Sequence, residues 1–126
     1  MMRKAAAQIT FYYTDKYAET IKFYQNILGL DIVLDQGSCM IFAVSSQAYL
    51  GFCQSAAAPR TDSTIFTFVT EEVDAWYNQL KAKGVQFTKP PQLNQKFQIY
   101  HTFLLDPNGY KLEIQKFLDP NWSKTS

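Results

Sequence analysis

The chain has 126 residues, 47% of them hydrophobic, which is enough to bury a core without disulfides or metal ions. Its 12 basic and 11 acidic residues give a net charge of +1 and form no run of one sign, which excludes nucleic acid and anionic membranes as main partners. The first residues are basic but lead into no apolar segment of signal-peptide length, so we expect a cytoplasmic protein.

The first half of the chain is expected to contain one helix and four strands. Residues 8–13 alternate polar and apolar side chains, which predicts a strand with two different faces. The following apolar residues recur every three or four positions up to Leu28, as in an amphipathic helix, and Gly29 stands where a left-handed residue would end it. Further strands are expected over 30–34, 39–44 and 48–53.

The two cysteines of the chain are Cys39 and Cys53. Their spacing matches neither a close metal-binding pair nor a disulfide framework. We interpret them as two small buried apolar residues.

Residues 55–63 are small, polar and interrupted by a proline, which predicts a connection between two halves. The second half then repeats the first, while residues 88–96, with their two prolines, are expected to form one long irregular loop. The tail, 118–126, is expected to be a surface extension that Trp122 attaches to the body. The elements of this half are a strand over 64–69, a helix over 71–83, a strand beginning at 85–87, and a hairpin of 99–105 and 110–117.

Both predicted helices end at a glycine, Gly29 or Gly84, that leads directly into a short apolar strand. Such an internal duplication predicts two similar units with a cleft between them. The sequence Asp106-Pro107-Asn108-Gly109 in the last hairpin has the residue preferences of a type I turn.

Two sequence motifs resemble those of the glyoxalase/bleomycin-resistance/extradiol-dioxygenase superfamily, which has the vicinal oxygen chelate (VOC) fold. They are Phe23-Tyr24 followed by Leu28-Gly29, and the turn at 106–109 followed by Glu113. The resemblance implies an α+β fold in which two tandem βαβββ modules form curved mixed sheets around a cleft. It assigns residues 1–126 to a single domain, with modules over about 7–54 and 64–117, and it implies a homodimer.

In metal-dependent relatives a divalent ion is held by side chains from the first and last strands of each half. The matching positions here are Gln8, Ile65, Glu113 and one near Leu50 or Gly51. Isoleucine, leucine and glycine cannot ligate a metal, so the resemblance implies a degenerate metal site and no cofactor. If a metal is bound, its ligands are Gln8 and Glu113.

The cleft is expected to carry a small set of ligand-binding side chains. Glu113 is expected there because Leu112 and Ile114, on either side of it, would pack on a helix. His101 is the only histidine, the residue type whose unperturbed pKa suits proton transfer near neutral pH, and it and Glu113 are the catalytic candidates if the protein is an enzyme. The sequence does not fix across the turn whether His101 faces the cleft. The predicted ligand-binding residues are Gln8, Tyr12, Ile65, Tyr100 and Glu113.

Two functions are compatible with these residues. In the first, the cleft sequesters a small planar or amphipathic organic molecule, as drug-resistance members of the family do, with Glu113 facing a cationic or hydrogen-bond-donating group of the ligand. In the second, the protein is a metal-dependent lyase, isomerase or dioxygenase, with Gln8 and Glu113 as ligands and His101 as a third. The missing ligands favour the first.

Overall fold

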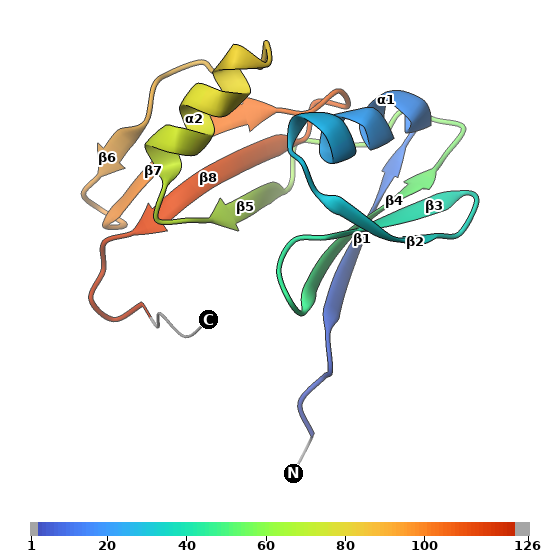
Figure 1. Ribbon diagram of the computed structural model, residues 1–126, viewed down its shortest axis with the longest axis horizontal. Coiled ribbons are helices and arrows are strands. Elements are labelled where there is room, and N and C mark those ends of the chain that lie inside the picture. Colours follow the sequence, from blue (N-terminus) through green and yellow to red (C-terminus); the bar gives the residue numbers. More distant parts are fainter. Residues whose placement is uncertain (1–2, 123–126) are drawn as a thin grey trace. The chain divides into compact units, whose positions relative to one another are not determined.

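The computed structural model describes residues 3–122, in two compact units, Met1–Arg60 (unit 1) and Thr61–Ser126 (unit 2). The boundary between the units lies inside the predicted connection, 55–63. Each unit contains a four-stranded mixed sheet and helical structure in the order of a βαβββ module, so the predicted α+β fold of two tandem modules is confirmed (Figure 1). Within residues 3–122, no helix is long and apolar enough to cross a membrane.

The sheet of unit 1 has the strand order β1-β4-β3-β2, with β1 parallel to β4. The predicted helix begins as α-helix and finishes in a π-helical turn, η1, after which Gly29 adopts a φ of 74° and ends it as expected. The elements are β1 (Gln8–Thr14), α1 (Tyr17–Lys22), η1 (Phe23–Ile27), β2 (Asp31–Asp35), β3 (Cys39–Ala43) and β4 (Ala48–Gln54).

The core of unit 1 is aromatic. Tyr24, on η1, packs against Phe52 of β4 with ring centroids 4.6 Å apart and against Phe42 of β3 at 5.9 Å, and all three side chains are fully buried. Burying one such side chain stabilises the folded state by about 1.5–3 kcal/mol. The helix therefore covers one face of this sheet, and we call the other its open face.

Cys39 and Cys53 are joined by a disulfide, so the interpretation of two separate buried cysteines was wrong. The two residues lie directly opposite each other on the antiparallel strands β3 and β4, with 4.1 Å between their Cα atoms, and both are half-buried. The pairing depends on the register of these strands, which the spacing of the cysteines in the sequence does not reveal.

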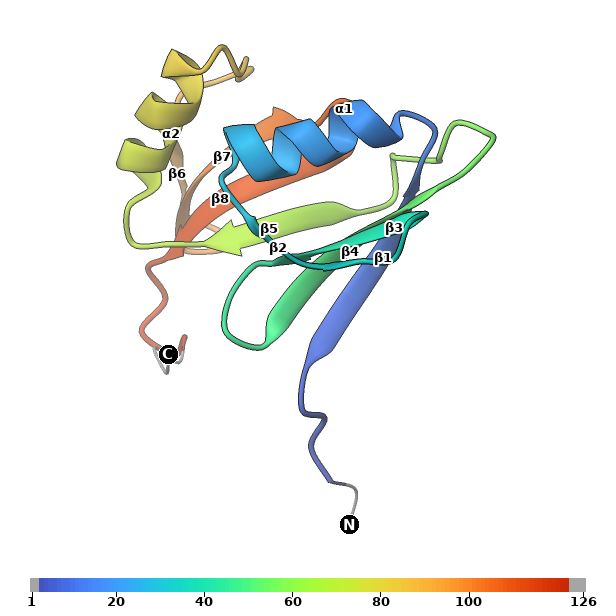
Figure 2. The ribbon, with the colours of Figure 1, turned by 45° about the vertical axis from the view of Figure 1, so that its right-hand side comes forward.

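The sheet of unit 2 has the strand order β5-β8-β7-β6, with β5 parallel to β8, and α2 lies over one face of it (Figure 2). Leu112 and Ile114, on β8, are almost fully buried on the face that α2 covers, as their alternation with Glu113 predicts. The elements are β5 (Ile65–Val69), α2 (Val73–Ala82), β6 (Gln92–Asn94), β7 (Ile99–Leu105) and β8 (Lys111–Phe117).

The segment between α2 and β7 differs from the prediction. Residues 85–87 form only a single bridge, between Phe87 and Leu104, whereas a strand, β6, lies inside the stretch that was expected to be irregular. The two prolines at 90 and 91 cannot donate to a sheet, so pairing resumes after them at the sheet edge. Trp122 in the tail stacks on Phe117 with ring centroids 4.0 Å apart, as expected.

Candidate functional site

The open face of the unit 2 sheet, opposite α2, carries a hollow of about 510 Å³. We call it the aromatic hollow because phenylalanine dominates its wall. Its apolar lining consists of Ile65, Phe97, Ile99, Phe103 and Phe117, and its polar lining of Asn94, His101, Glu113 and Gln115.

The turn at 106–109 decides which side chains of β7 and β8 meet in this hollow. The predicted turn is confirmed, since the backbone N–H of Gly109 donates to the carbonyl of Asp106 at 3.0 Å. The resulting register places Phe103 opposite Glu113 and His101 opposite Gln115. His101 and Glu113 are therefore diagonal neighbours on one face of the sheet, and His101 faces the hollow.

Glu113 is buried, at 8% exposure, and both of its carboxylate oxygens are hydrogen-bonded within the protein. Oε2 lies 2.7 Å from His101 Nδ1, and Oε1 accepts a hydrogen bond of 2.8 Å from the hydroxyl of Thr67 on β5. An ionised carboxylate can only accept a hydrogen bond, so beside an ionised Glu113 the hydrogen lies on Nδ1, and in that neutral tautomer Nε2 is an acceptor. Both oxygens of Glu113 therefore have a partner within the protein, and Glu113 still lines the hollow together with His101, so its contact with a ligand stays a prediction.

Two ammonium groups lie against the aromatic wall. Lys111 Nζ is 5.2 Å from the ring centroid of Phe103, and Lys96 Nζ is 5.4 Å from that of Phe97. Phe103 also meets the edge of the His101 ring, with centroids 5.0 Å apart. The wall therefore combines flat apolar surface with nearby positive charge.

Three of the predicted site residues, Ile65, Glu113 and the catalytic candidate His101, line the aromatic hollow. Tyr100 does not, contrary to the expectation, because it alternates with His101 and its hydroxyl donates to Asp74 Oδ1 of α2 at 2.6 Å. That hydrogen bond, followed by burial and the negative charge of Asp74, raises the pKa of Tyr100 above 10.0.

The other two predicted residues, Gln8 and Tyr12, belong to unit 1. Tyr12 packs against Phe52 at 6.2 Å between centroids, so it faces the helix and not the open face of its sheet. Gln8 has the same parity and donates to the hydroxyl of Thr10 at 2.5 Å. Sequence alternation separated the two faces of β1 correctly, but aromatic residues on both of them concealed which face the helix covers. The open face instead carries Ile9, Phe11 and Tyr13, which are 40%, 47% and 62% exposed.

Sequence reasoning missed six residues of the hollow. Alternation with Glu113 would have identified Gln115 and Phe117, and alternation with His101 would have added Ile99 and Phe103 once the turn was counted. Asn94 lies in the stretch that was expected to be irregular, 88–96, and Phe97 follows directly after that stretch.

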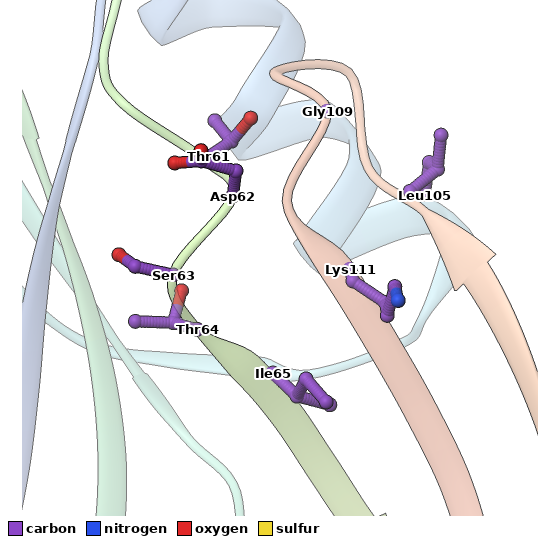
Figure 3. Close-up of a pocket in the computed structure, with 8 residues that line it drawn as sticks. All are labelled: Thr61, Asp62, Ser63, Thr64, Ile65, Leu105, Gly109 and Lys111. Carbon is purple, nitrogen blue, oxygen red and sulfur yellow. The ribbon is translucent and has the colours of Figure 1, made fainter.

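A second, larger hollow of about 650 Å³ lies beside the first and shares Ile65 with it. Its wall is formed by residues 61–65 together with Leu105, Gly109 and Lys111. Figure 3 shows that Asp62 and Lys111 come from opposite walls of this hollow. It contains no histidine, so the aromatic hollow is the better candidate for chemistry.

The residues of the aromatic hollow do not fit a protein-bound divalent ion. His101 and Glu113 are its only two strong ligands, and they are bonded to each other. In the part of the chain that the structure describes, residues 3–122, no group of three or more His, Cys, Asp or Glu side chains comes together.

Comparison with known proteins places these features in a family. The model of the Glyoxalase/Bleomycin resistance protein/Dioxygenase superfamily matches residues 6–114. The metallothiol transferase FosB of Staphylococcus haemolyticus is 29% identical over 121 residues, which cover 90% of this chain and 84% of that protein.

Solved structures of the same fold include a glyoxalase/bleomycin resistance protein/dioxygenase from Nocardioides, with a TM-score of 0.79 and 16% identity over 100% of this chain and 91% of that one. A lactoylglutathione lyase from Agrobacterium tumefaciens has a TM-score of 0.76 and 20% identity over 96% and 100%. An antibiotic binding protein from a Streptomyces species has a TM-score of 0.78 and 18% identity over 92% and 98%. The chain belongs to the glyoxalase/bleomycin resistance protein/dioxygenase superfamily.

Proposed function

We propose that the protein binds a small organic molecule in the aromatic hollow and that it does so without a resident metal ion or other cofactor. The volume of about 510 Å³ falls within the roughly 300–1,000 Å³ of ordinary ligand pockets. The wall has the composition of such pockets, since mainly apolar side chains surround a few convergent polar groups. The observation that carries the proposal is that Glu113, the carboxylate in the lining, is already hydrogen-bonded on both oxygens, to His101 and to Thr67, so a metal ion would have to compete with these partners.

The second candidate function is that of a metal-dependent enzyme, a lyase, isomerase or dioxygenase. The observation in its favour is the 29% identity to a metallothiol transferase, which extends over most of both chains. In this reading Glu113 and His101, the two strong ligands in the hollow, would hold the metal. His101 would then have to leave its hydrogen bond with Glu113, which costs about 1.5–3 kcal/mol for a bond to a charged group.

Elemental analysis of the purified protein, combined with thermal unfolding in the presence of zinc, manganese, nickel and iron(II), separates the two functions. A protein that binds a metal only when folded gains about 2.7 kcal/mol at a metal concentration one hundred times the dissociation constant. We expect less than stoichiometric metal and no stabilisation. One bound ion per chain that is lost in the variant Glu113→Ala would favour the enzyme.

Binding itself is tested by thermal unfolding with a panel of planar aromatic compounds. Phe97 lines the hollow and is 61% exposed, so Phe97→Ala should weaken binding with little loss of fold stability. Leu93, on the neighbouring strand β6, is 65% exposed but does not line the hollow, so Leu93→Ala is the matched control. Equal effects of the two variants on binding would contradict the proposed location.

We also propose a cytoplasmic homodimer that binds neither nucleic acid nor membrane. Exposed apolar side chains support a homodimer, because they occur on both open faces, with Phe11 at 47%, Ile65 at 50% and Val69 at 48%. The Cys39–Cys53 disulfide makes the cytoplasmic location testable, since the cysteines of proteins in reducing compartments are usually kept as thiols. In a cytoplasmic protein, thiol labelling in freshly lysed cells should find both cysteines reduced, with the bond forming only during purification without reductant; a bond already present in the cells would contradict the location.

A further inference from the structure

We infer that His101 accepts a proton from the bound molecule, and that this molecule is a planar weak acid such as a phenol. The inference rests on the proposed binding function and names the class of ligand for the same hollow. It depends on four features of the site, which are the orientation of the His101 ring, the free nitrogen of that ring, the charges around it and the shape of the wall.

The first feature is the chain of hydrogen bonds from Thr67 through Glu113 to His101. The hydroxyl of Thr67 fixes one carboxylate oxygen at 2.8 Å, and the other oxygen holds His101 Nδ1 at 2.7 Å. This arrangement fixes both the rotation of the imidazole ring and its tautomer. A histidine held in this way by a carboxylate is stabilised when its ring becomes protonated.

The second feature is His101 Nε2, which takes no part in this chain of hydrogen bonds. Among residues 3–122 the structure provides no hydrogen-bond partner for His101 Nε2. The His101 side chain, which lines the hollow, is 15% exposed. A ring nitrogen with a lone pair and no protein donor can accept a hydrogen bond from a ligand. Gln115 lies opposite His101 and lines the same hollow, so its amide can hold a second polar atom of the ligand.

The third feature is the sign of the charges around His101. Among the lining residues that the structure describes, Glu113 is the other titratable group, and hydrogen bonds to His101 and Thr67 hold its carboxylate. Lys111 and Lys96 lie over the rings of Phe103 and Phe97, and no second carboxylate lines the hollow. Two ammonium groups near a hollow with one paired carboxylate favour a ligand that becomes an anion.

The fourth feature is the aromatic wall. Phe97, Phe103 and Phe117 all line the hollow, and such an aromatic lining suits a ligand that contains an aromatic ring. A phenol is an aromatic weak acid whose acidic hydrogen can be placed within reach of Nε2, and it is the class that we propose. On binding, the proton leaves the phenol oxygen and joins Nε2, the O–H electron pair stays on the oxygen, and the imidazolium lies between the phenolate and Glu113.

The probe is 4-nitrophenol, whose neutral and ionised forms absorb at different wavelengths. Its spectrum is recorded with saturating protein, at a pH where the free compound is mostly neutral. We expect the ratio of ionised to neutral 4-nitrophenol to rise about tenfold on binding, which corresponds to one unit of pKa. In the variant His101→Asn, measured at saturating protein, the bound 4-nitrophenol should lose this rise, and Glu113→Gln should reduce it.

Two controls complete the experiment. Tyr100 precedes His101 on the same strand but bonds to α2, so Tyr100→Phe should leave the spectrum of bound 4-nitrophenol unchanged. The methyl ether 4-nitroanisole has no acidic proton, so replacing His101 by Asn should weaken its binding less than that of 4-nitrophenol. If both compounds bind and 4-nitrophenol stays neutral, or if His101→Asn retains the rise, the inference fails and the binding function stands. If neither compound binds, both fail.

Discussion

The disulfide between Cys39 and Cys53 should provide a large part of the stability of unit 1. The two cysteines are 14 positions apart, so the bond closes a loop of about 15 residues, for which the chain-entropy model gives a stabilisation of about 3 kcal/mol. Domains of this size unfold with a total free energy of about 5–15 kcal/mol. Replacing both cysteines by serine, or reducing the bond, should therefore remove a substantial fraction of that free energy.

Urea unfolding followed by far-ultraviolet circular dichroism measures the effect. With a slope of about 1–3 kcal/mol per molar urea, a loss of about 3 kcal/mol lowers the midpoint by roughly 1–3 M. Trp76 and Trp122 both belong to unit 2, so tryptophan fluorescence reports on that unit and serves as an internal reference. The double serine variant should unfold identically with and without reductant.

The reasoning on the disulfide would be refuted in either of two ways. Oxidised and reduced protein might unfold at the same urea concentration, which would mean that the loop is already constrained in the unfolded chain. Alternatively, thiol titration of the native protein purified without reductant might find two free thiols per chain, which would mean that the bond does not form.

Three further predictions follow from other contacts. The raised pKa of Tyr100 means that the stability from its hydrogen bond to Asp74 is fully present below the ordinary tyrosine pKa of 10.0 and is lost as the pH rises through the higher value. Tyr100→Phe should therefore flatten the alkaline part of the curve of unfolding free energy against pH, and parallel curves for both proteins would contradict this. A Cβ atom at Gly51 would lie 2.6 Å from Cδ1 of Phe11, so Gly51→Ala should lower the free energy of unfolding in urea by about 1–3 kcal/mol. Adding Phe11→Ala should recover part of that loss, and no recovery would exclude the clash as its cause. Light scattering at micromolar concentration should give the mass of a homodimer, and a monomer would contradict the proposed assembly.

Local sequence patterns predicted the parts of the fold that depend on local chemistry. The stop at Gly29 and the turn at 106–109 follow from residues that favour particular backbone angles, and both are confirmed. The alternation around Glu113 predicted correctly that Leu112 and Ile114 face the helix. Each of these depends on residues within a few positions of one another.

Features that depend on how separate segments meet could not be predicted. The Cys39–Cys53 bond depends on the register of β3 and β4, and the position of β6 depends on its pairing with β7 beyond two prolines. The alternation of β1 is compatible with either face being covered, because Tyr12 on one face and Phe11 on the other are both aromatic. The hydrogen bond between Thr67 and Glu113 joins strands 46 positions apart, and no local pattern contains it.

The turn at 106–109 also decides whether the candidate site exists at all. Asp106 Oδ1 accepts hydrogen bonds from the backbone N–H groups of Asn108 at 2.8 Å and Tyr110 at 2.9 Å, which holds the loop at one length. One inserted or deleted residue there would shift β7 by one position against β8, which would send His101 to the helix side and bring Tyr100 into the hollow. A relative could thus lose the proton acceptor while keeping every side chain of the site, so the length of this turn in homologous sequences is as informative about function as the identity of residue 101.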